Sequence, residues 1–388
     1  MKKIKLGELF KIQSGFAFKS GDIKSDGIPI IRIGNIQNNS VIVDNNYCYN
    51  IDFLNNEKNN NYIISKGDLL IAMSGATTGK VGIYPHEKEA LLNQRVGKFI
   101  NLGSEINLKY LYYVLQSPKF KRMITQKAVG CAQPNISNKD IEAIELPFYS
   151  NEEKKSIVEE FNYLYKLIDN RKKQIIDLKQ LIHNYYEINF GKYQIVKEIG
   201  ELCTIKARIG WQGLTKKEYL KDGPCYLITG VDFVENRINF NNCYCVTEER
   251  YKQDENIQIH KTDVLVTKDG TIGKVAYINE EPNKPTTLNS GVFVIRPKET
   301  TELNSIFLEY SLMSEKFSKF IDNIKTGATI SHLNQEAFLK YKIPFASKQE
   351  QECFAKYVTL IEKNISICEK DICDLQKIIT NKMHVFFD

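Results

Sequence analysis

Two long stretches of the chain carry apolar residues at alternating steps of four and three. The first runs from Glu152 to Phe190 without proline or glycine, and the second begins near residue 348. Alternation of four and three is the heptad pattern of a coiled coil. The seam positions, which differ by 197 between the copies, are Ile157, Phe161, Leu164, Ile168, Ile175, Leu178 and Ile182, then Phe354, Val358, Ile361, Ile365, Ile372, Leu375 and Ile379.

Each predicted helix follows a mixed segment of about 150 residues. Short β-rich runs such as IPIIRIGNI, DLLIAMS and VLVTKDG alternate there with turn signals, which indicates strands. One amphipathic helix is expected in each segment, around residues 108–124 and 305–321. We therefore predict a mixed α/β fold with recognisable boundaries. These are a first globular domain at 1–150, a helix at 151–191, a second globular domain at 192–346 and a helix at 347–388.

The two helices can pair in two ways. If their seams pack within one chain, the second helix runs back along the first, giving an antiparallel coiled coil with a similar domain at each end and a pseudo-two-fold axis. Alternatively, each helix pairs with another chain, and the sequence leaves that choice open.

A glycine loop also occurs twice, in GDLLIAMSGATTGKVGIY (67–84) and TDVLVTKDGTIGKVAYI (262–278). A phosphate-binding loop needs four residues between its first Gly and the Gly-Lys pair, followed by Ser or Thr. Here Gly75 and Gly79 enclose three residues, Gly270 and Gly273 enclose two, and valine follows each lysine. The pattern thus favours a duplicated turn over a nucleotide site.

Composition narrows the possible function. The net charge of +6 permits a polyanionic partner without requiring one. We find no apolar run long enough for a signal peptide or membrane span, and no metal-ligand spacing among the cysteines and histidines. The motifs HExxH, GxSxG, GxGxxG and the (N/D)PP(Y/F) tetrapeptide of amino-methyltransferases are missing. We expect a cytoplasmic protein that is not an enzyme and binds neither metal nor cofactor.

Two similar domains about a two-fold axis match the symmetry of duplex DNA. Arg, Lys, Asn and Gln read base edges, while Lys, Thr and backbone amides contact phosphates. In the first domain the loop-placed candidates are Lys19, Arg32, Asn35, Thr77, Thr78, Lys80, Asn93, Gln94 and Arg95. In the second they are Arg208, Trp211, Gln212, Lys216, Lys268, Asp269, Thr271, Lys274 and Asn289. The small-residue loops at 130–137 and 327–334 are interpreted as hinges or partner contacts.

Several doubled motifs, in their order along the chain, resemble one family. They are the glycine loop followed by GKV, the asparagine segments LLNQRVGKFI and TLNSGVFVIRP, and a Pro-Phe pair followed by SNEEKKSIV or SKQEQECFA. ARIGWQGLTKKEY is similar to a recurrent domain opening of that family. Together they resemble the specificity subunit of type I restriction-modification systems, over essentially the whole chain. SNEEKK and GCAQPNIS depart modestly from the usual EQ pair and GS-type loop.

The resemblance implies a function. The globular segments would be target-recognition domains, each reading one half of a bipartite DNA sequence. The helices would act as a spacer and would dock two modification subunits, which carry S-adenosylmethionine and methylate adenine N6. Restriction subunits would join to form the nuclease, and this chain would catalyse nothing itself. The alternatives are a coiled-coil scaffold that binds no DNA and a self-sufficient enzyme, which the missing motifs disfavour.

Overall fold

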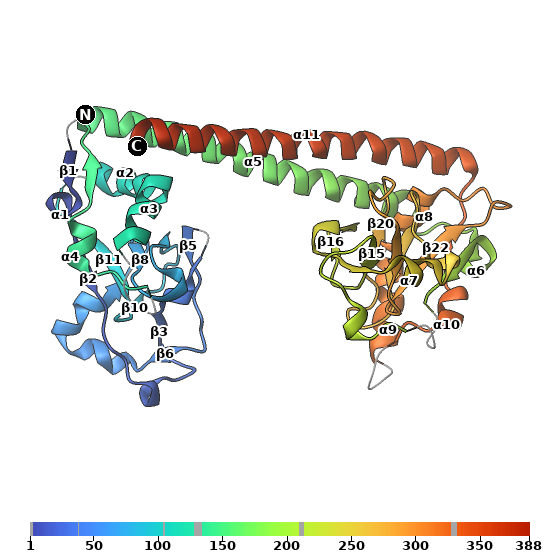
Figure 1. Cartoon of the computed structure of the whole chain (residues 1–388), viewed down its shortest axis with the longest axis horizontal. Coiled ribbons are helices and arrows are strands. Elements are labelled where there is room, and N and C mark those ends of the chain that lie inside the picture. Colours follow the sequence, from blue (N-terminus) through green and yellow to red (C-terminus); the bar gives the residue numbers. More distant parts are fainter. Residues whose placement is uncertain (1–2, 38, 104, 128–133, 209–212, 327–331) are drawn as a thin grey trace. The chain divides into compact units, whose positions relative to one another are not determined.

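The computed structural model describes residues 3–37, 39–103, 105–127, 134–208, 213–326 and 332–388. The chain forms two compact units (Figure 1). Unit 1 comprises Met1–Arg171 with Lys370–Asp388, and unit 2 comprises Lys172–Glu369. Each unit therefore contains one globular domain and parts of both long helices, α5 (Asn151–Phe190) and α11 (Lys348–Phe387).

Unit 1 contains a six-stranded sheet beside a four-stranded one. In spatial order the larger sheet is β2 (Phe10–Ser14), β11 (Val96–Asn101), β8 (Leu69–Ala72), β9 (Val81–Ile83), β5 (Asn39–Val41) and β4 (Ile36–Gln37). The smaller is β6 (Cys48–Tyr49), β3 (Ile28–Ile31), β10 (Ala90–Leu92) and β7 (Ile63–Ile64). β1 (Lys3–Lys5) pairs with β12 (Glu145–Pro147), just before α5.

Unit 2 repeats this topology. Its four-stranded sheet is β14 (Cys203–Lys206), β22 (Val292–Pro297), β19 (Val264–Thr267) and β20 (Val275–Tyr277), the counterpart of β2–β11–β8–β9. A second sheet is β18 (Tyr244–Val246), β15 (Cys225–Ile228) and β21 (Thr286–Leu288). The smaller pairs are β16 (Phe233–Val234) with β17 (Arg237–Ile238), and β13 (Val196–Glu198) with β23 (Lys342–Pro344).

The shorter helices also recur in the two units. Unit 1 has α1 (Leu6–Leu9), α2 (Glu105–Gln116), α3 (Pro118–Lys127) and α4 (Asn138–Glu142). Unit 2 has α6 (Ile199–Leu202), α7 (Glu248–Lys252), α8 (Ser305–Leu312), α9 (Glu315–Thr326) and α10 (Gln335–Leu339). This mixed α/β architecture in two similar copies confirms the predicted fold class.

The prediction of one amphipathic helix per domain was wrong in detail. Two helices, α2 and α3 or α8 and α9, occupy each predicted segment. A serine ends the first helix and caps the second: the Oγ of Ser117 accepts from the Phe120 N–H, and that of Ser314 accepts from the Phe317 N–H, both at 3.2 Å. Such a cap satisfies an N–H that the first helical turn leaves free.

Both long helices begin with the same capping box. The Oγ of Ser150 accepts from the Glu153 N–H at 3.2 Å, and the Glu153 carboxylate accepts from the Ser150 N–H at 2.7 Å. Ser347 and Glu350 repeat the arrangement at 3.4 and 2.8 Å. The sequence Ser-x-x-Glu thus fixes the start of each helix.

Within each unit, α5 and α11 pack antiparallel (Figure 1). In unit 1, Glu160 contacts Lys382 and Arg171 contacts Asp371, so the residue numbers along α11 decrease as those along α5 increase. In unit 2, Tyr185 stacks on Tyr357 with ring centroids 4.6 Å apart. The predicted seam residues are buried or partly buried, and the helices pair within one chain. The predicted intramolecular coiled coil is confirmed.

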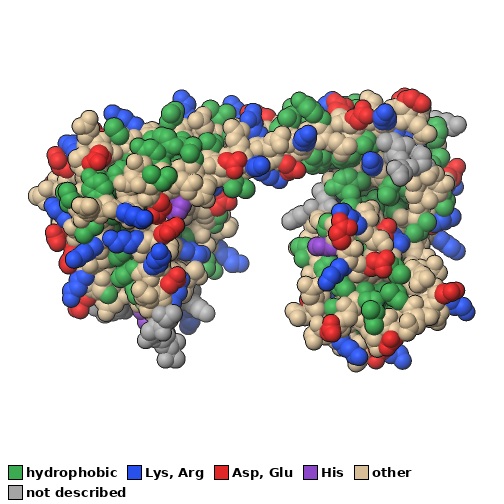
Figure 2. All heavy atoms as spheres, turned by 180° about the vertical axis from the view of Figure 1, so that it is seen from behind, with side chains coloured by type: hydrophobic (Ala, Val, Ile, Leu, Met, Phe, Trp, Pro, Cys, Tyr) green, Lys and Arg blue, Asp and Glu red, His purple; other side chains and the backbone are tan. Residues whose placement is uncertain are grey.

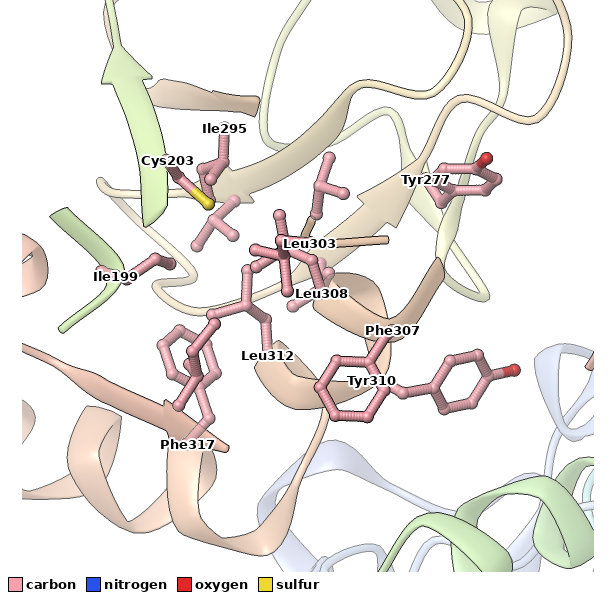
Figure 3. Close-up of a cluster of buried hydrophobic side chains, with 14 of the residues drawn as sticks. Ile199, Cys203, Tyr277, Ile295, Leu303, Phe307, Leu308, Tyr310, Leu312 and Phe317 are labelled. Atoms are coloured by element: carbon pink, nitrogen blue, oxygen red, sulfur yellow. The ribbon is translucent and has the colours of Figure 1, made fainter. Parts of the chain in front are cut away.

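The core of unit 2 lies between its four-stranded sheet and helices (Figure 3). Phe307, Leu308 and Leu312 of α8 belong to the same buried cluster as Ile295 of β22 and Cys203 of β14. Phe190 of α5 packs edge-on against Phe307, with centroids 4.9 Å apart. The long helices are therefore part of the same core as the globular domain. Full burial of one Phe side chain contributes about 2–3 kcal/mol to the stability of such a core.

Candidate nucleic-acid interface

In unit 1 the glycine loop is the turn between β8 and β9. The Gly79 N–H donates to the Ala72 carbonyl at 2.8 Å, and the Ala72 N–H donates to the Lys80 carbonyl at 2.9 Å. Gly79 has φ of 82°, and a Cβ there would lie 2.7 Å from Cγ2 of Ile124 on α3. Glycine is therefore required by its backbone conformation and by the close approach of a helix.

Backbone hydrogen bonds join this turn to two other loops. The Met73 N–H donates to the Arg95 carbonyl at 3.0 Å, and the Gly75 N–H donates to the Pro134 carbonyl at 2.9 Å. The Gln94 N–H donates to the Phe16 carbonyl, also at 2.9 Å. We call residues 74–80, 93–95 and 134–136 the three-loop cluster of unit 1. It brings together the predicted residues Thr77, Thr78, Lys80, Asn93, Gln94 and Arg95.

Unit 2 contains the same cluster, formed by residues 268–274, 289–291 and 332–334. The Lys268 N–H donates to the Gly291 carbonyl at 2.9 Å, and the Leu333 N–H donates to the Lys268 carbonyl at 3.0 Å. Asp269 contacts the ring of His332. The small-residue loops, interpreted above as hinges or partner contacts, therefore pack at their described ends against the glycine loops of their own domains.

An asparagine occupies the same turn in both clusters. The N–H of Asn93 donates to the Ile31 carbonyl at 3.2 Å, and that of Asn289 donates to the Ile228 carbonyl at 3.0 Å. The Asn289 Oδ1 accepts from the Gly291 N–H at 2.9 Å. An asparagine that bonds its own backbone two residues on stabilises a turn. These residues thus have a structural role, and their side-chain NH₂ groups are the parts suited to a ligand.

Two predicted DNA contacts lie inside the protein instead. Arg208 is 2% exposed, and its guanidinium donates to the Leu288 carbonyl at 2.8 Å and to the Thr287 hydroxyl at 3.1 Å. Asn35 is 8% exposed, and its side chain bonds the backbone of Arg32 and Ile42, each at 2.9 Å. Both side chains hold loops in place, so the structure corrects the expectation that they face DNA.

Other candidates are partly committed to local contacts. Arg32 pairs with Asp44 at 3.1 Å and lies over the Tyr47 ring, 3.6 Å from its centroid. The Thr78 hydroxyl donates to the Gly75 carbonyl at 2.7 Å. The side chain of Lys268 lies beside Asp269, with Nζ 3.7 Å from Oδ2.

The remaining candidates differ in how far they are exposed. Those on the surface are Lys19, Lys80, Gln94, Arg95 and Thr271, and Lys274 is half-buried. Gln212 and Trp211 lie outside the described residues, and Lys216 begins the short helix Lys216–Glu218. Glu218, at the other end of that helix, accepts hydrogen bonds from the Thr215 backbone and hydroxyl and from Arg250, which hold it in place. The same hydrogen bonds lower the pKa of Glu218 to about 2.

An aromatic cluster beside Gln94 was missed from the sequence. Phe16 packs against Phe18 and Phe53, with centroids 5.1 Å apart in each case, and against Tyr62 at 5.4 Å. Phe18 packs on Tyr49 at 4.8 Å. All five rings are half-buried. Only the FAF triplet at 16–18 signalled it, since the other rings come from distant positions. Aromatic faces of this kind can stack on nucleic-acid bases.

Charge on the units is mixed. Figure 2 shows many Lys and Arg side chains on the visible face of the globular part of unit 2, among acidic and hydrophobic ones. Within the described residues no group of three His, Cys, Asp or Glu side chains could hold a metal ion. No helix of that part of the chain is long and apolar enough to cross a membrane. The arrangement offers polar loops and turns for binding, and the described residues include no metal-binding group of this kind.

A comparison with protein families assigns both domains to a class of DNA-specificity domain. The family model for the type I restriction modification DNA specificity domain matches residues 1–180 and again 192–376. The chain belongs to this family.

Curated relatives and solved structures agree with this assignment. The chain is 22% identical over 402 residues to the EcoBI specificity subunit of Escherichia coli, covering 94% of this chain and 81% of that one. The MjaVIII specificity subunit of Methanocaldococcus jannaschii is 29% identical over 175 residues, 44% of this chain and 41% of that relative. The crystal structure of an S subunit from M. genitalium shares the fold, with a TM-score of 0.52, 18% identity and coverage of 100% and 96%.

Proposed function

We propose that this chain is the non-catalytic DNA-recognition subunit of a type I restriction-modification complex. Each unit reads one half of a bipartite, asymmetric double-stranded target. The observation that carries the proposal is the three-loop cluster, which occurs once in each unit of a chain that matches the specificity domain twice. Exposed residues such as Lys80, Gln94 and Arg95 supply base and phosphate contacts in unit 1.

The partners dock on the long helices. Exposed apolar side chains recur there at the repeat offset of 197, in the pairs Tyr163 and Leu360, Leu181 and Ile378, and Ile188 and Val385, each at least 43% exposed. Three belong to unit 1 (Tyr163, Ile378, Val385) and three to unit 2. Exposed apolar side chains on a helix can form part of a protein-binding site, and their recurrence in both copies supports this role. Two equivalent surfaces support the docking of two modification subunits.

The chemistry belongs to those partners. The modification subunits bind S-adenosylmethionine and methylate adenine N6, and restriction subunits join where the complex also cleaves DNA. The assembly acts on DNA in the cytoplasm. Affinity for DNA falls steeply with salt, because phosphate contacts release condensed counterions.

The test of recognition is the methylome of cells that express this chain with its modification partners. We expect N6-methyladenine in one split motif, two short half-sites with an unspecified gap, and its loss when this gene alone is deleted. A scaffold that does not read DNA would leave the methylome unchanged on deletion, which would refute the proposal.

The test of docking uses one substitution per unit. Ile378→Asp in unit 1 and Leu181→Asp in unit 2 should each remove one modification subunit, and the double variant should remove both. Native mass spectrometry of the co-expressed complex reports the stoichiometry. Lys173→Asp changes the charge of an exposed, polar position of α5 and is the control. Two bound subunits in the double variant would place the docking surface elsewhere.

A further inference from the structure

The hairpin of β16 and β17 carries an unusual charged turn. Glu235 and Asn236 form its two-residue tip, with φ of 47° and 63°. Positive φ at both positions is typical of a type I′ turn, which Asn tolerates better than Glu. The Asn236 carbonyl accepts from the Tyr277 N–H of β20 at 3.2 Å, so the tip is attached to the strand that follows the glycine loop.

Arg237, the next residue, connects this hairpin to two helices. Its Nη1 donates to Oε1 of Glu309 on α8 at 2.7 Å, and its Nη2 contacts Glu362 on α11. The guanidinium also lies 5.7 Å from the centroid of the Tyr277 ring. A third link joins Glu235 to Lys179 of α5. One short hairpin is therefore held by charge to α8 and to both long helices, all within unit 2.

Burial makes this arrangement costly. Glu309 is 1% exposed, and no described residue hydrogen-bonds its second carboxylate oxygen, Oε2. A buried ion pair is weak evidence for stability, because desolvation offsets the attraction. Its directional contacts can instead favour one arrangement over others. Glu309 and Glu362 are thus better explained by positioning than by stability.

The corresponding place in unit 1 is built from aromatic rings. At the offset of 197, Tyr112 corresponds to Glu309 and Tyr165 to Glu362. There Tyr113 stacks on Phe161 with centroids 4.8 Å apart, and on Tyr165 at 5.9 Å. Two copies of one fold have therefore diverged at the junction of globular domain and helices, and the ionic version occurs in unit 2.

The same hairpin also faces the candidate DNA interface. A groove of about 510 Å³ is lined by the tip residues Glu235 and Asn236 together with Gly273 and Lys274 of the glycine loop. A second groove of about 480 Å³ lies between the tip, Arg237 and the helices. The hairpin therefore stands between the three-loop cluster and the helices, with open space on two sides, and directional contacts must set its position.

We propose that Arg237 is a positioning residue that holds the recognition loops of unit 2 in place on α8 and α11, so that reading of one half-site depends on it. The inference rests on the proposed function, since it assumes that unit 2 reads DNA. Releasing Arg237 removes the anchors of the hairpin on α8 and α11, so that its tip, which bonds β20 and lines a groove with the glycine loop, is no longer fixed, while the aromatic junction of unit 1 is unaffected. Discrimination should then be lost in one half of the target only.

The test uses the full chain reconstituted with its modification subunits. Methylation rates are measured on targets that carry a single mismatch in one half-site or in the other. Cross-linking of bromodeoxyuridine-substituted DNA to peptides of unit 2 first assigns its half-site. Arg237→Met should reduce discrimination against mismatches in that half-site at least tenfold, leave the other half-site within twofold, and be partly rescued by Arg237→Lys.

Two further variants keep the experiment decisive. Arg171→Met removes an α5–α11 ion pair in unit 1, where Nε and the Asp371 carboxylate are 3.0 Å apart, and should change neither half-site. Glu362→Gln leaves the buried pair of Arg237 and Glu309 intact, and should show a smaller loss in the same half-site if Arg237→Met folds poorly. If Arg237→Met leaves discrimination unchanged, or lowers it equally in both half-sites, the inference is overturned. A wild-type complex that methylates no split motif would instead overturn the proposed function.

Discussion

Substituting Glu309 is expected to change how the stability of unit 2 depends on pH. Burial, with a smaller contribution from Glu362 and against the opposing effect of Arg237, raises the pKa of Glu309 from 4.5 to about 7. The folded protein then binds this proton more tightly than the unfolded chain does. The resulting stabilisation is fully present below pH 4.5 and is lost as the pH rises through about 7.

The magnitude follows from the two pKa values. One pKa unit corresponds to about 1.4 kcal/mol, so the difference between 4.5 and about 7 corresponds to roughly 3 kcal/mol. Most of this stabilisation should be lost between pH 5 and pH 8. Glu309→Gln keeps an oxygen that accepts from Arg237 but cannot titrate, so its free energy of unfolding should lack this component.

Hydrogen exchange of the amides in β19 and β22 measures the free energy of opening of unit 2 within the full chain. Exchange is followed at pH 5, 6.5 and 8 and corrected for intrinsic rates. Glu369 is an exposed carboxyl that lines, with Glu309, the groove between the hairpin and the long helices. Glu369→Gln is therefore the matched control and should keep the wild-type dependence of stability on pH. Parallel pH dependences for the wild type and Glu309→Gln would refute the reasoning, because the buried carboxyl would then have an ordinary pKa.

Two further predictions concern the loops. Gly273 has φ of 83°, and an added Cβ would lie 2.8–3.2 Å from three atoms of Ile321, whereas Gly270, with φ of 71°, faces open space. Hydrogen exchange should therefore show that Gly273→Ala destabilises unit 2 by about 1–3 kcal/mol more than Gly270→Ala does. Equal losses of stability in the two variants would contradict the packing argument. Arg95→Gln should lower the slope of log DNA affinity against log salt concentration by about one counterion. Arg208→Met should instead lower the stability of unit 2 and leave that slope unchanged. DNA affinity measured from about 50 to 200 mM salt distinguishes the two variants, and an equal loss of slope in both would place Arg208 on DNA.

The two long helices and their starting points could be predicted from the sequence because their signals are periodic or repeated. The seam from Ile157 to Ile182 has the spacing that buries one face of a helix. Ser150 and Ser347 have a glutamate three residues later, which marks a helix start. Such signals need only neighbours along the chain. The break at Ser117 was missed because its cap lies inside an otherwise continuous apolar pattern.

The candidate site was predictable only in part. The glycine and asparagine loops were found by their duplication. The burial of Arg208 could not be found, since it depends on carbonyl and hydroxyl groups some 80 residues away. The aromatic cluster joins Phe16 to Phe53 and Tyr62, and the contacts of Arg237 reach residues 72 and 125 positions further along the chain. Only the tertiary fold brings such residues together.

Duplication within one chain separates what the fold requires from what differs between its copies. Gly79 and Gly273 retain the same φ and the same closeness to a helix isoleucine, because any side chain would collide there. Tyr112 and Glu309, in contrast, occupy equivalent positions with opposite chemistry, and both are compatible with the fold. If each unit reads a different half-site, the requirement on this junction is that it hold its own loops still. The junction consists of stacked rings in unit 1 and of the ionic contacts of Arg237 in unit 2.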